Sequence, residues 1–356
     1  MSSPDFLICA SLQCAGSSNG ILGLVTLAKT IEKLGRNAFI CQIIGKNDEA
    51  IYTGDLRKHH PADATESNLI GSVLDNAKRH DVRLLEDFSR QKLDSSYVIY
   101  PDAVLDNPLR ARMVIRYFGN RDGILKGGAK VNRAADDFLV AHSRFMVPDA
   151  HHLCTFTRIN PLFNRTDTLP PLRRTLDLSY IGKGALYGVN AKISNTVAIT
   201  RNWPESKEEL AALLRNCRFF YTADSCSHIN NEALSCGALP VFLHNGPWTD
   251  AELDSFEAGA MPRLRLGEII DEARCDEFER ARDVYLDRMA TIERQWELSV
   301  RALIEKVDLH FAVPRQARSN PAPAPARKPS QRLSRKERKR WMKNAGRSPE
   351  TPASGR

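Results

Sequence analysis

Short, uniformly apolar runs along this chain alternate with segments in which apolar residues recur every three or four positions. The first run, residues 6–10, leads through a Gly/Ser loop into a segment at residues 21–34 whose apolar positions share one helical face. A second apolar run, residues 38–44, follows Gly35. This order predicts a β-α-β unit at the start of an α/β protein.

The same alternation continues to about residue 309, which predicts an α/β fold with parallel sheets in each half of the chain. Further strands are predicted at residues 96–100, 113–117, 137–142, 176–181, 196–200, 217–221 and 239–243. Further helices are predicted at residues 206–216, 229–236 and 271–309, with a break allowed in the last one.

A loop rich in Pro, Arg and Thr at residues 160–175 separates the two series of elements. We therefore expect an N-terminal Rossmann-like domain at 1–170, a second one at 171–290, a closing helix at 291–312 and a tail at 313–356. Alternating Pro and Ala open this tail and exclude a packed helix or strand, so we expect disorder there.

The positive charge of the chain is confined to the tail. The formal net charge is +8, but the residues from Val313 onward contain 13 Lys or Arg against two Glu, which leaves −3 for the remainder. The body therefore does not favour nucleic acid as a partner. Residues 327–343, where Trp341 and Met342 follow a basic run, suit an anionic membrane surface; a solvated tail and RNA binding are the alternatives.

The remaining composition indicates a cytoplasmic protein, with a peripheral place at the inner face of the membrane as an alternative. The N-terminus has no basic n-region, and no stretch approaches the roughly 20 apolar residues that cross a bilayer. The eight cysteines form no C-x-x-C pair, and no histidine cluster has metal-ligand spacing. We expect reduced core thiols and no metal, the alternative being a nucleophilic Cys226 or Cys236.

The segment 217–243 has the form of a binding site. A buried strand ends near Asp224, a polar loop follows, and a helix carries Glu232 before it ends at Gly237. Backbone N–H groups at the start of that helix suit a diphosphate. The alternative is that Asp224 caps the helix and Glu232 is solvated. The amides in question belong to Ser227, His228 and Ile229.

This segment resembles the E-x7-E signature of retaining GT-B glycosyltransferases, with its trailing E-A-x-x-x-G-x-P-V and with Asp224 in place of the first Glu. The resemblance implies the GT-B fold, in which two Rossmann-like domains face a cleft. It also implies that Glu232 binds the ribose of a nucleotide, that Asp224 binds hydroxyl groups of the donor sugar, and that the helix amides bind the diphosphate.

Residues 100–123 resemble a second stretch of this family, found in its bacterial polysaccharide and lipopolysaccharide enzymes. Asp102, Asn107 and Arg116 are the candidates for acceptor or phosphate contacts there, with Asp102 taking the place of a Glu. The alternative is turn chemistry from Pro101 and from the Asn-Pro pair at 107–108.

Smaller motifs complete the predicted site. Lys183 lies in a glycine-bordered loop after a strand, where its charge can neutralise a departing diphosphate; an ordinary exposed lysine is the alternative. His142 ends a strand and is a core or a catalytic histidine. The other candidates are Gly182 and Arg201 for the donor, the latter near the nucleotide base, and Gly16 and Asn19 for the cleft side of the first domain.

The resemblance implies transfer of a sugar from a nucleoside-diphosphate-sugar to a hydroxyl of a glycan or lipid-linked acceptor, in cell-surface polysaccharide synthesis. It implies no cofactor, because the nucleotide-sugar is a substrate. One alternative is a nucleotide-sugar epimerase, phosphorylase or other nucleotide-sugar enzyme. The other is a non-catalytic RNA- or membrane-binding protein that acts through the tail.

Overall fold

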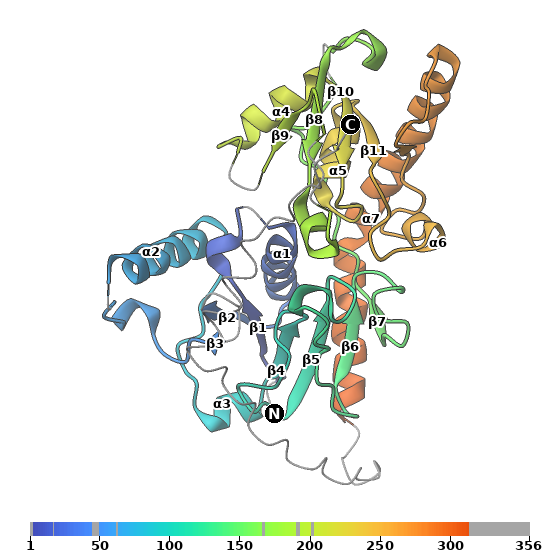
Figure 1. Cartoon of the computed structure of the whole chain (residues 1–356). Coiled ribbons are helices and arrows are strands. Elements are labelled where there is room, and N and C mark those ends of the chain that lie inside the picture. The colour runs from blue at the N-terminus through green and yellow to red at the C-terminus, as the bar shows by residue number, and fades with distance from the viewer. Residues whose placement is uncertain are drawn as a thin grey trace, which may run out of the picture. The chain divides into compact units, whose positions relative to one another are not determined.

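A computed structural model shows how the body of the chain folds (Figure 1). The tail from residue 313 onward lies outside the described residues, so its disorder and its partners stay predictions. The structure describes residues 3–16, 18–44, 50–61, 63–165, 168–189, 193–200 and 203–312.

The first sheet has seven strands in the order β3-β2-β1-β4-β5-β6-β7. Every neighbouring pair is parallel except β2 and β3. This is a Rossmann order, and its direction reverses between β1 and β4. The strands are β1 (Phe6–Ala10), β2 (Ala38–Ile44), β3 (Ala50–Ile51), β4 (Tyr97–Pro101), β5 (Met113–Phe118), β6 (Phe138–Ala141) and β7 (His152–Leu153).

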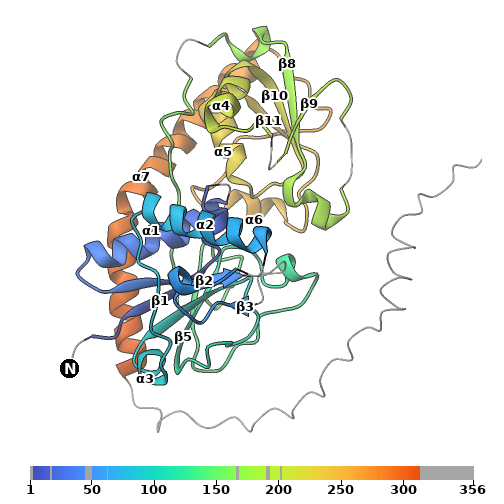
Figure 2. The same ribbon diagram turned by 90° about the vertical axis from the view of Figure 1, so that its left-hand side faces the viewer.

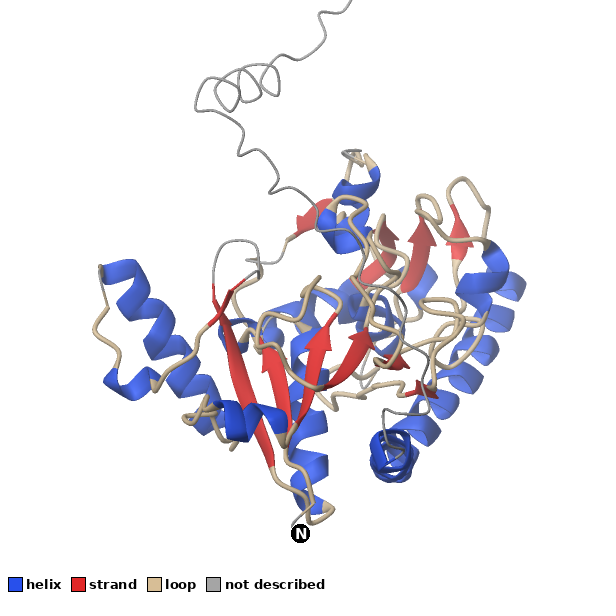
Figure 3. Cartoon of the chain, turned by 90° about the horizontal axis from the view of Figure 1, so that it is seen from below, coloured by secondary structure: helices blue, strands red, loops and turns tan. Residues whose placement is uncertain are grey.

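Both faces of the first sheet are covered, which explains why its strands read as continuous apolar runs. From β1, Phe6 and Ile8 join a core shared with α1 (Asn19–Lys33), α2 (Ala64–Arg79) and the long C-terminal helix. Leu7 and Cys9 point to the opposite face and pack with Leu93 of α3 (Arg90–Asp94). Figures 2 and 3 show these helices around the central strands.

The second sheet has five parallel strands in the order β12-β11-β10-β8-β9. Its direction reverses between β8 and β10. Two Rossmann-like sheets in one α/β chain confirm the architecture predicted for a GT-B fold. The elements are β8 (Leu176–Tyr180), β9 (Val197–Ile199), α4 (Lys207–Asn216), β10 (Cys217–Thr222), α5 (His228–Ser235), β11 (Leu239–Phe242), α6 (Asp250–Asp254) and β12 (Leu264–Arg265).

The C-terminal helix α7 (Glu272–Ala312) joins the two cores. Phe278 and Tyr285 pack in the core of the second sheet, whereas Leu303 and Val307 pack in that of the first. The helix is continuous, so it lacks the break that the pattern allowed, and the predicted boundary at residue 290 falls inside it. In Figure 1, α7 is the orange helix that passes both sheets.

Short 3-10 turns connect several of these elements. They are η1 (Leu12–Cys14), η2 (Leu56–Lys58), η3 (Ile124–Lys126), η4 (Pro171–Arg173) and η5 (Gly182–Tyr187). Among the described helices, none combines the length and the apolarity that crossing a membrane requires.

Candidate functional site

Four side chains from the carboxyl ends of four strands form one connected group, which we name the switch-point chain. Asp224 follows β10, Lys183 follows β8, Asp102 follows β4, and Asn120 follows β5. In open α/β sheets, ligands bind outside the carboxyl ends of strands where the strand order reverses. The switch-point chain includes residues from both reversal points, β8/β10 and β1/β4.

Asp224 is the buried end of this chain, with only 2% of its surface exposed. Its Oδ2 accepts the backbone N–H of Lys183 at 2.9 Å, and the Lys183 Nζ lies 3.9 Å from Oδ1. Oδ1 is buried and has no hydrogen-bond partner among the described residues. Because buried carboxylate oxygens are nearly always paired, Oδ1 is an acceptor suited to a ligand hydroxyl.

The glycines around Lys183 allow this close approach. A Cβ added to Gly182 would lie 2.4 Å from the Tyr180 ring and 2.6 Å from Asp224 Oδ2, and Gly182 has a φ of +50°. A Cβ on Gly184 would lie 2.5 Å from that of Ala223. Packing therefore requires a glycine on each side of Lys183, whatever the lysine binds.

Helix α5 begins beside Asp224, and its first amides differ from the prediction. Ser227 is the N-cap, and its N–H donates to the Asp224 carbonyl at 3.1 Å, so this amide is already engaged. The predicted diphosphate contact is left to His228 and Ile229, because the first N–H groups of a helix have no carbonyl partner within it. Burial lowers the pKa of His228, which favours the neutral imidazole.

Glu232 lies on α5 and is 7% exposed, so it is not the solvated helix residue of the alternative interpretation. Its Oε1 accepts a hydrogen bond from Lys207 Nζ at 2.8 Å. Lys207 is the first residue of α4, and its ammonium lies 5.4 Å from the centre of the Phe163 ring. Sequence reasoning missed Lys207, since no local motif links it to Glu232. The ribose contact of Glu232 stays a prediction.

Asn120 connects the two sheets. Its Oδ1 accepts a hydrogen bond from Lys183 Nζ at 3.1 Å, while its backbone N–H and its Nδ2 both donate to Asp102 Oδ2, at 2.6 and 3.1 Å. Burial raises the pKa of Asp102 to about 6, although the Asn120 hydrogen bonds and the Lys183 charge act in the opposite direction. Asn120 belongs to the family-like stretch at 100–123, but the sequence suggested no role for it.

Arg116 is not part of the switch-point chain. It is 3% exposed, its Nε donates to Asp137 Oδ2 at 2.9 Å, and its other nitrogens donate to backbone carbonyls, among them those of Asp106 and Asn132. A guanidinium used in this way fixes the loops around it. The geometry gives no support to its predicted contact with acceptor or phosphate.

Asn107 likewise serves its own loop. Its Oδ1 accepts hydrogen bonds from the Tyr100 hydroxyl and the Ala111 N–H, both at 2.8 Å, and its Nδ2 donates to the Ala111 carbonyl at 2.9 Å. This is the turn chemistry of the alternative interpretation. Both polar atoms of its side chain are engaged within the loop, which leaves the predicted acceptor contact without support.

The remaining candidates lie at the edges of the site. Gly16 is exposed in the loop after β1, and Asn19 is the first residue of α1, whose N-cap is Ser18. Their predicted contacts on the cleft side stay predictions. Arg201 lies outside the described residues.

His142 belongs to a second polar network between the two sheets. Its Nδ1 accepts the Phe156 N–H at 3.3 Å, so its Nε2 carries the proton that it donates to Glu257 at 3.1 Å. Glu257 also accepts from Asn231 of α5, which in turn accepts from Tyr285 of α7. Burial alone would raise the pKa of Glu257, but the hydrogen bonds from His142 and Asn231 hold it below the usual value. The core interpretation of His142 fits this arrangement.

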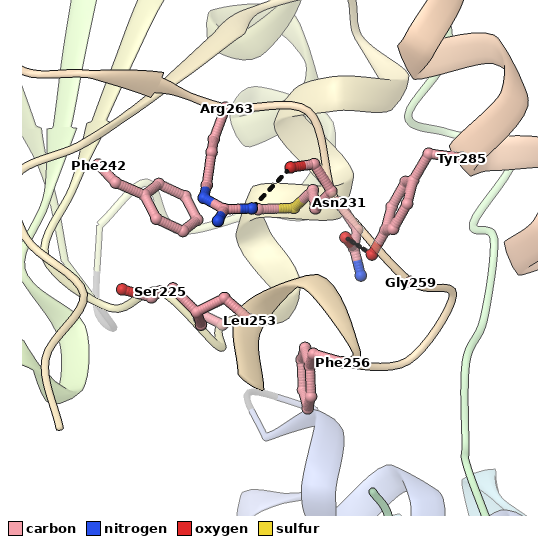
Figure 4. Close-up of a pocket in the computed structure, with 10 residues that line it drawn as sticks. Ser225, Asn231, Phe242, Leu253, Phe256, Gly259, Arg263 and Tyr285 are labelled. Atoms are coloured by element: carbon pink, nitrogen blue, oxygen red, sulfur yellow. Dashed lines mark hydrogen bonds between the residues drawn. The ribbon is translucent and has the colours of Figure 1, made fainter. Parts of the chain in front are cut away.

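A small cavity lies beside α5, where the hydrogen-bonded side chains of Asn231 and Tyr285 meet (Figure 4). It shares Ser227 with the predicted donor site but does not include Asp224 or Lys183. Its lining is formed by Ser225, Ser227, Asn231, Phe242, Leu253, Phe256, Gly259, Met261, Arg263 and Tyr285.

The cysteines are all within the described residues, and none is in a disulfide. Burial raises the pKa of the Cys236 thiol to about 12, and it raises that of Cys226 as well. Both groups are therefore protonated at neutral pH, which argues against the nucleophilic alternative. In the part of the chain that the structure describes, no group of three or more His, Cys, Asp or Glu side chains is arranged to hold a metal ion.

Comparisons with known proteins give the following results. No family model and no curated protein matches the chain. Among solved structures, the chain is similar to the spinosyn forosaminyltransferase SpnP, with 16% identity and a TM-score of 0.38 over 86% of this chain and 100% of that one. It is also similar to the glycosyltransferase SnogD from Streptomyces nogalater, with 12% identity and a TM-score of 0.33 over 84% and 100%. The architecture is defined by the two sheets themselves.

Proposed function

We propose that this chain is a glycosyltransferase that moves a sugar from a nucleoside-diphosphate-sugar to a hydroxyl group of a glycan or lipid-linked acceptor. The observation that best supports the proposal is the switch-point chain. In it, Lys183 binds the buried Asp224 of its own sheet and donates to Asn120 of the other sheet, and Asn120 donates in turn to Asp102. Ligands of α/β sheets bind at such positions.

In this proposal the second sheet holds the donor. Asp224 Oδ1 accepts a sugar hydroxyl, and Glu232 binds the ribose of the nucleotide. Lys183 and the first amides of α5 stabilise the negative charge that develops on the departing diphosphate, which is the main catalytic contribution. The nucleotide-sugar is a substrate, and the reaction needs no resident cofactor.

The first sheet presents the acceptor. Asp102 hydrogen bonds to the attacking hydroxyl and receives its proton as the new glycosidic bond forms and the bond to the diphosphate breaks. A carboxylate with a pKa of about 6 is well matched to this role near neutral pH. The hydroxyl attacks on the face from which the diphosphate leaves, so the configuration at the sugar carbon is retained. A part in polysaccharide synthesis and a cytoplasmic location, with the tail at the membrane, complete the proposal.

Donor binding tests the proposal directly. A nucleotide-sugar that binds the folded state stabilises it by about 2.7 kcal/mol at 100 times its Kd, which raises the Tm. We expect a UDP-, GDP- or ADP-sugar to raise the Tm and a CMP-sugar, which lacks the diphosphate, to have no effect. Glu232→Ala should abolish the rise. Glu208→Ala, at an exposed carboxylate on α4, is the control and should keep it. A normal rise in Glu232→Ala would contradict the assignment.

The pH dependence of transfer tests Asp102. Its carboxyl must be ionised to receive a proton, so the transfer rate should fall as the pH drops through about 6. Asp102→Asn should lower kcat by about 100-fold or more and remove this acid limb. An Asp102→Asn enzyme with the wild-type pH profile would exclude the role.

A further inference from the structure

The geometry points to Asn120 as the positioning residue of this site: as a neutral bridge, it holds the Lys183 ammonium and the Asp102 carboxylate in register across the two sheets. The inference rests on the proposed function, because it assigns Asn120 to the same reaction. Asn120 acts through its neighbours and is not itself a group that reacts.

The bridge requires an acceptor on one side and donors on the other. An ammonium group only donates hydrogen bonds, and an ionised carboxylate only accepts them. The orientation of the Asn120 amide follows from this, with Oδ1 towards Lys183 at 3.1 Å and Nδ2 towards Asp102 at 3.1 Å. An aspartate would reach both neighbours but cannot donate to Asp102 from its side chain. An alanine side chain would reach neither, and only the backbone N–H would still donate to Asp102.

The neutrality of the bridge matters for the donor. Lys183 Nζ is 3.9 Å from Asp224, and its side chain is 20% exposed. A direct ion pair with Asp102 would place the ammonium between two carboxylates and reduce its attraction for a diphosphate. Asn120 engages one of the three donors of the ammonium group and adds no charge, so the others can serve phosphate oxygens.

The bridge also determines how Asp102 is presented. Asn120 gives two hydrogen bonds to one carboxylate oxygen, and the Gly119 backbone contributes another to the carboxylate. The titratable groups that face Asp102 are the Lys183 ammonium and the buried phenol of Tyr117. The backbone carbonyl of Tyr117 also accepts the Asp102 N–H at 3.0 Å. Asn120 therefore controls both the orientation of Asp102 and its ionisation.

The next residue shows that this contact is separate from ordinary packing between the sheets. Arg121 donates to the Pro247 carbonyl at 2.9 Å, pairs with Glu252 and lies 4.3 Å from the centre of the Trp248 ring. These contacts anchor the same loop to the second sheet without Lys183 or Asp102. Arg121→Ala is thus a matched control, because it loosens the loop but keeps the contacts of Asn120 with Lys183 and Asp102.

The test compares Asn120→Asp, Asn120→Ala and Arg121→Ala in the full chain. For each variant we would measure the Tm, the Kd of the sugar nucleotide that stabilises the wild type, kcat, and the titration of Asp102 by NMR of ¹³C-labelled aspartate. Asp102→Asn assigns the resonance.

In Asn120→Asp, the new carboxylate should pair with Lys183 and weaken donor binding about tenfold. It should also raise the pKa of Asp102 by about one unit, because two carboxylates would then share the site. Asn120→Ala should lower kcat about tenfold or more and change the Kd less than about threefold. Arg121→Ala should lower the Tm only.

The inference is overturned if Asn120→Asp leaves the Asp102 titration unchanged, or if Asn120→Ala and Arg121→Ala reduce kcat equally. The titration needs no substrate. If the wild type binds no sugar nucleotide, the proposed function fails, while the titration still decides whether the bridge controls Asp102.

Discussion

Gly182 is the residue at which close packing and backbone conformation act together. An added Cβ would meet the Tyr180 ring and the Asp224 carboxylate, at a φ of +50°. We expect Gly182→Ala to displace Asp224, abolish donor binding and destabilise the fold by about 2 kcal/mol or more. The control is Gly188→Ala, which has a φ of +80° but open space around its Cβ, and should keep donor binding. Urea unfolding and the Tm rise with donor measure both effects.

At the same scale, the sequence singled out three members of the switch-point chain but not the residues that connect or pair with the candidate site. Asp224, Lys183 and Asp102 stood out because each follows an apolar strand, and the carboxyl ends of strands are where sites form. Asn107 and Arg116 come from the same stretch as Asp102, but they are used to hold loops. Asn120 and Lys207 owe their importance to contacts far along the chain, which a local pattern does not contain.

At the scale of elements, α7 makes the two cores depend on each other. Leu303 is fully buried in the first core, and we expect Leu303→Ala to lower the free energy of unfolding by about 2–5 kcal/mol. Because Tyr285 and Met289 of the same helix are buried in the second core, both sheets should unfold in one transition. Leu298→Ala, at a position that is 65% exposed, should change little. Circular dichroism and tryptophan fluorescence that give two separate transitions would contradict this coupling.

Most long elements were predicted from their periodicity, but α2 was missed although it has an apolar face, and elements that depend on neighbours were missed as well. The strands β1, β5 and β10 are apolar enough to be recognised alone, and α1 and α4 have clear apolar faces. The two-residue strands β3, β7 and β12 exist only through pairing with a longer strand. The parallel sheets followed from general rules for α/β folds, whereas the order of their strands and the packing of α7 into both cores did not.

At the scale of the whole molecule, His152 should make stability depend on pH. It is 8% exposed where β7 meets α7, its Nε2 lies 3.1 Å from the Ser299 carbonyl, and burial lowers its pKa to about 4, with the Lys306 charge acting in the same direction. Because the pKa of His152 is lower in the folded protein than in the unfolded chain, where it is about 6.5, the neutral imidazole stabilises the fold when the pH is above about 6.5. That contribution is lost as the pH falls from about 6.5 towards 4.

The expected loss is about 3 kcal/mol, from the difference between the two pKa values. Asp102, whose pKa is raised in the folded protein, acts in the opposite direction: its protonation increases the free energy of unfolding as the pH falls below about 6. The effect of His152 is therefore measured as the difference between the wild type and His152→Gln in urea unfolding from pH 8 to pH 4. Parallel curves for the two proteins would contradict it.

The separation of charge along the chain leads to a prediction about membranes. Residues from 313 onward carry a net +11 and the rest −3, so attraction to an anionic surface should come from the tail alone. Each Lys or Arg near such a surface contributes about 1 kcal/mol, so reversing four of them should weaken binding by about 100-fold or more. The four substitutions are Lys336→Glu, Arg338→Glu, Lys339→Glu and Arg340→Glu. Sedimentation with phosphatidylserine vesicles measures the effect, which should shrink at high salt.

The same variant should keep the full Tm rise with donor, since the switch-point chain lies in the body. Unchanged vesicle binding would show that the tail does not carry the attraction, and a lost Tm rise would show that the tail contributes to the donor site.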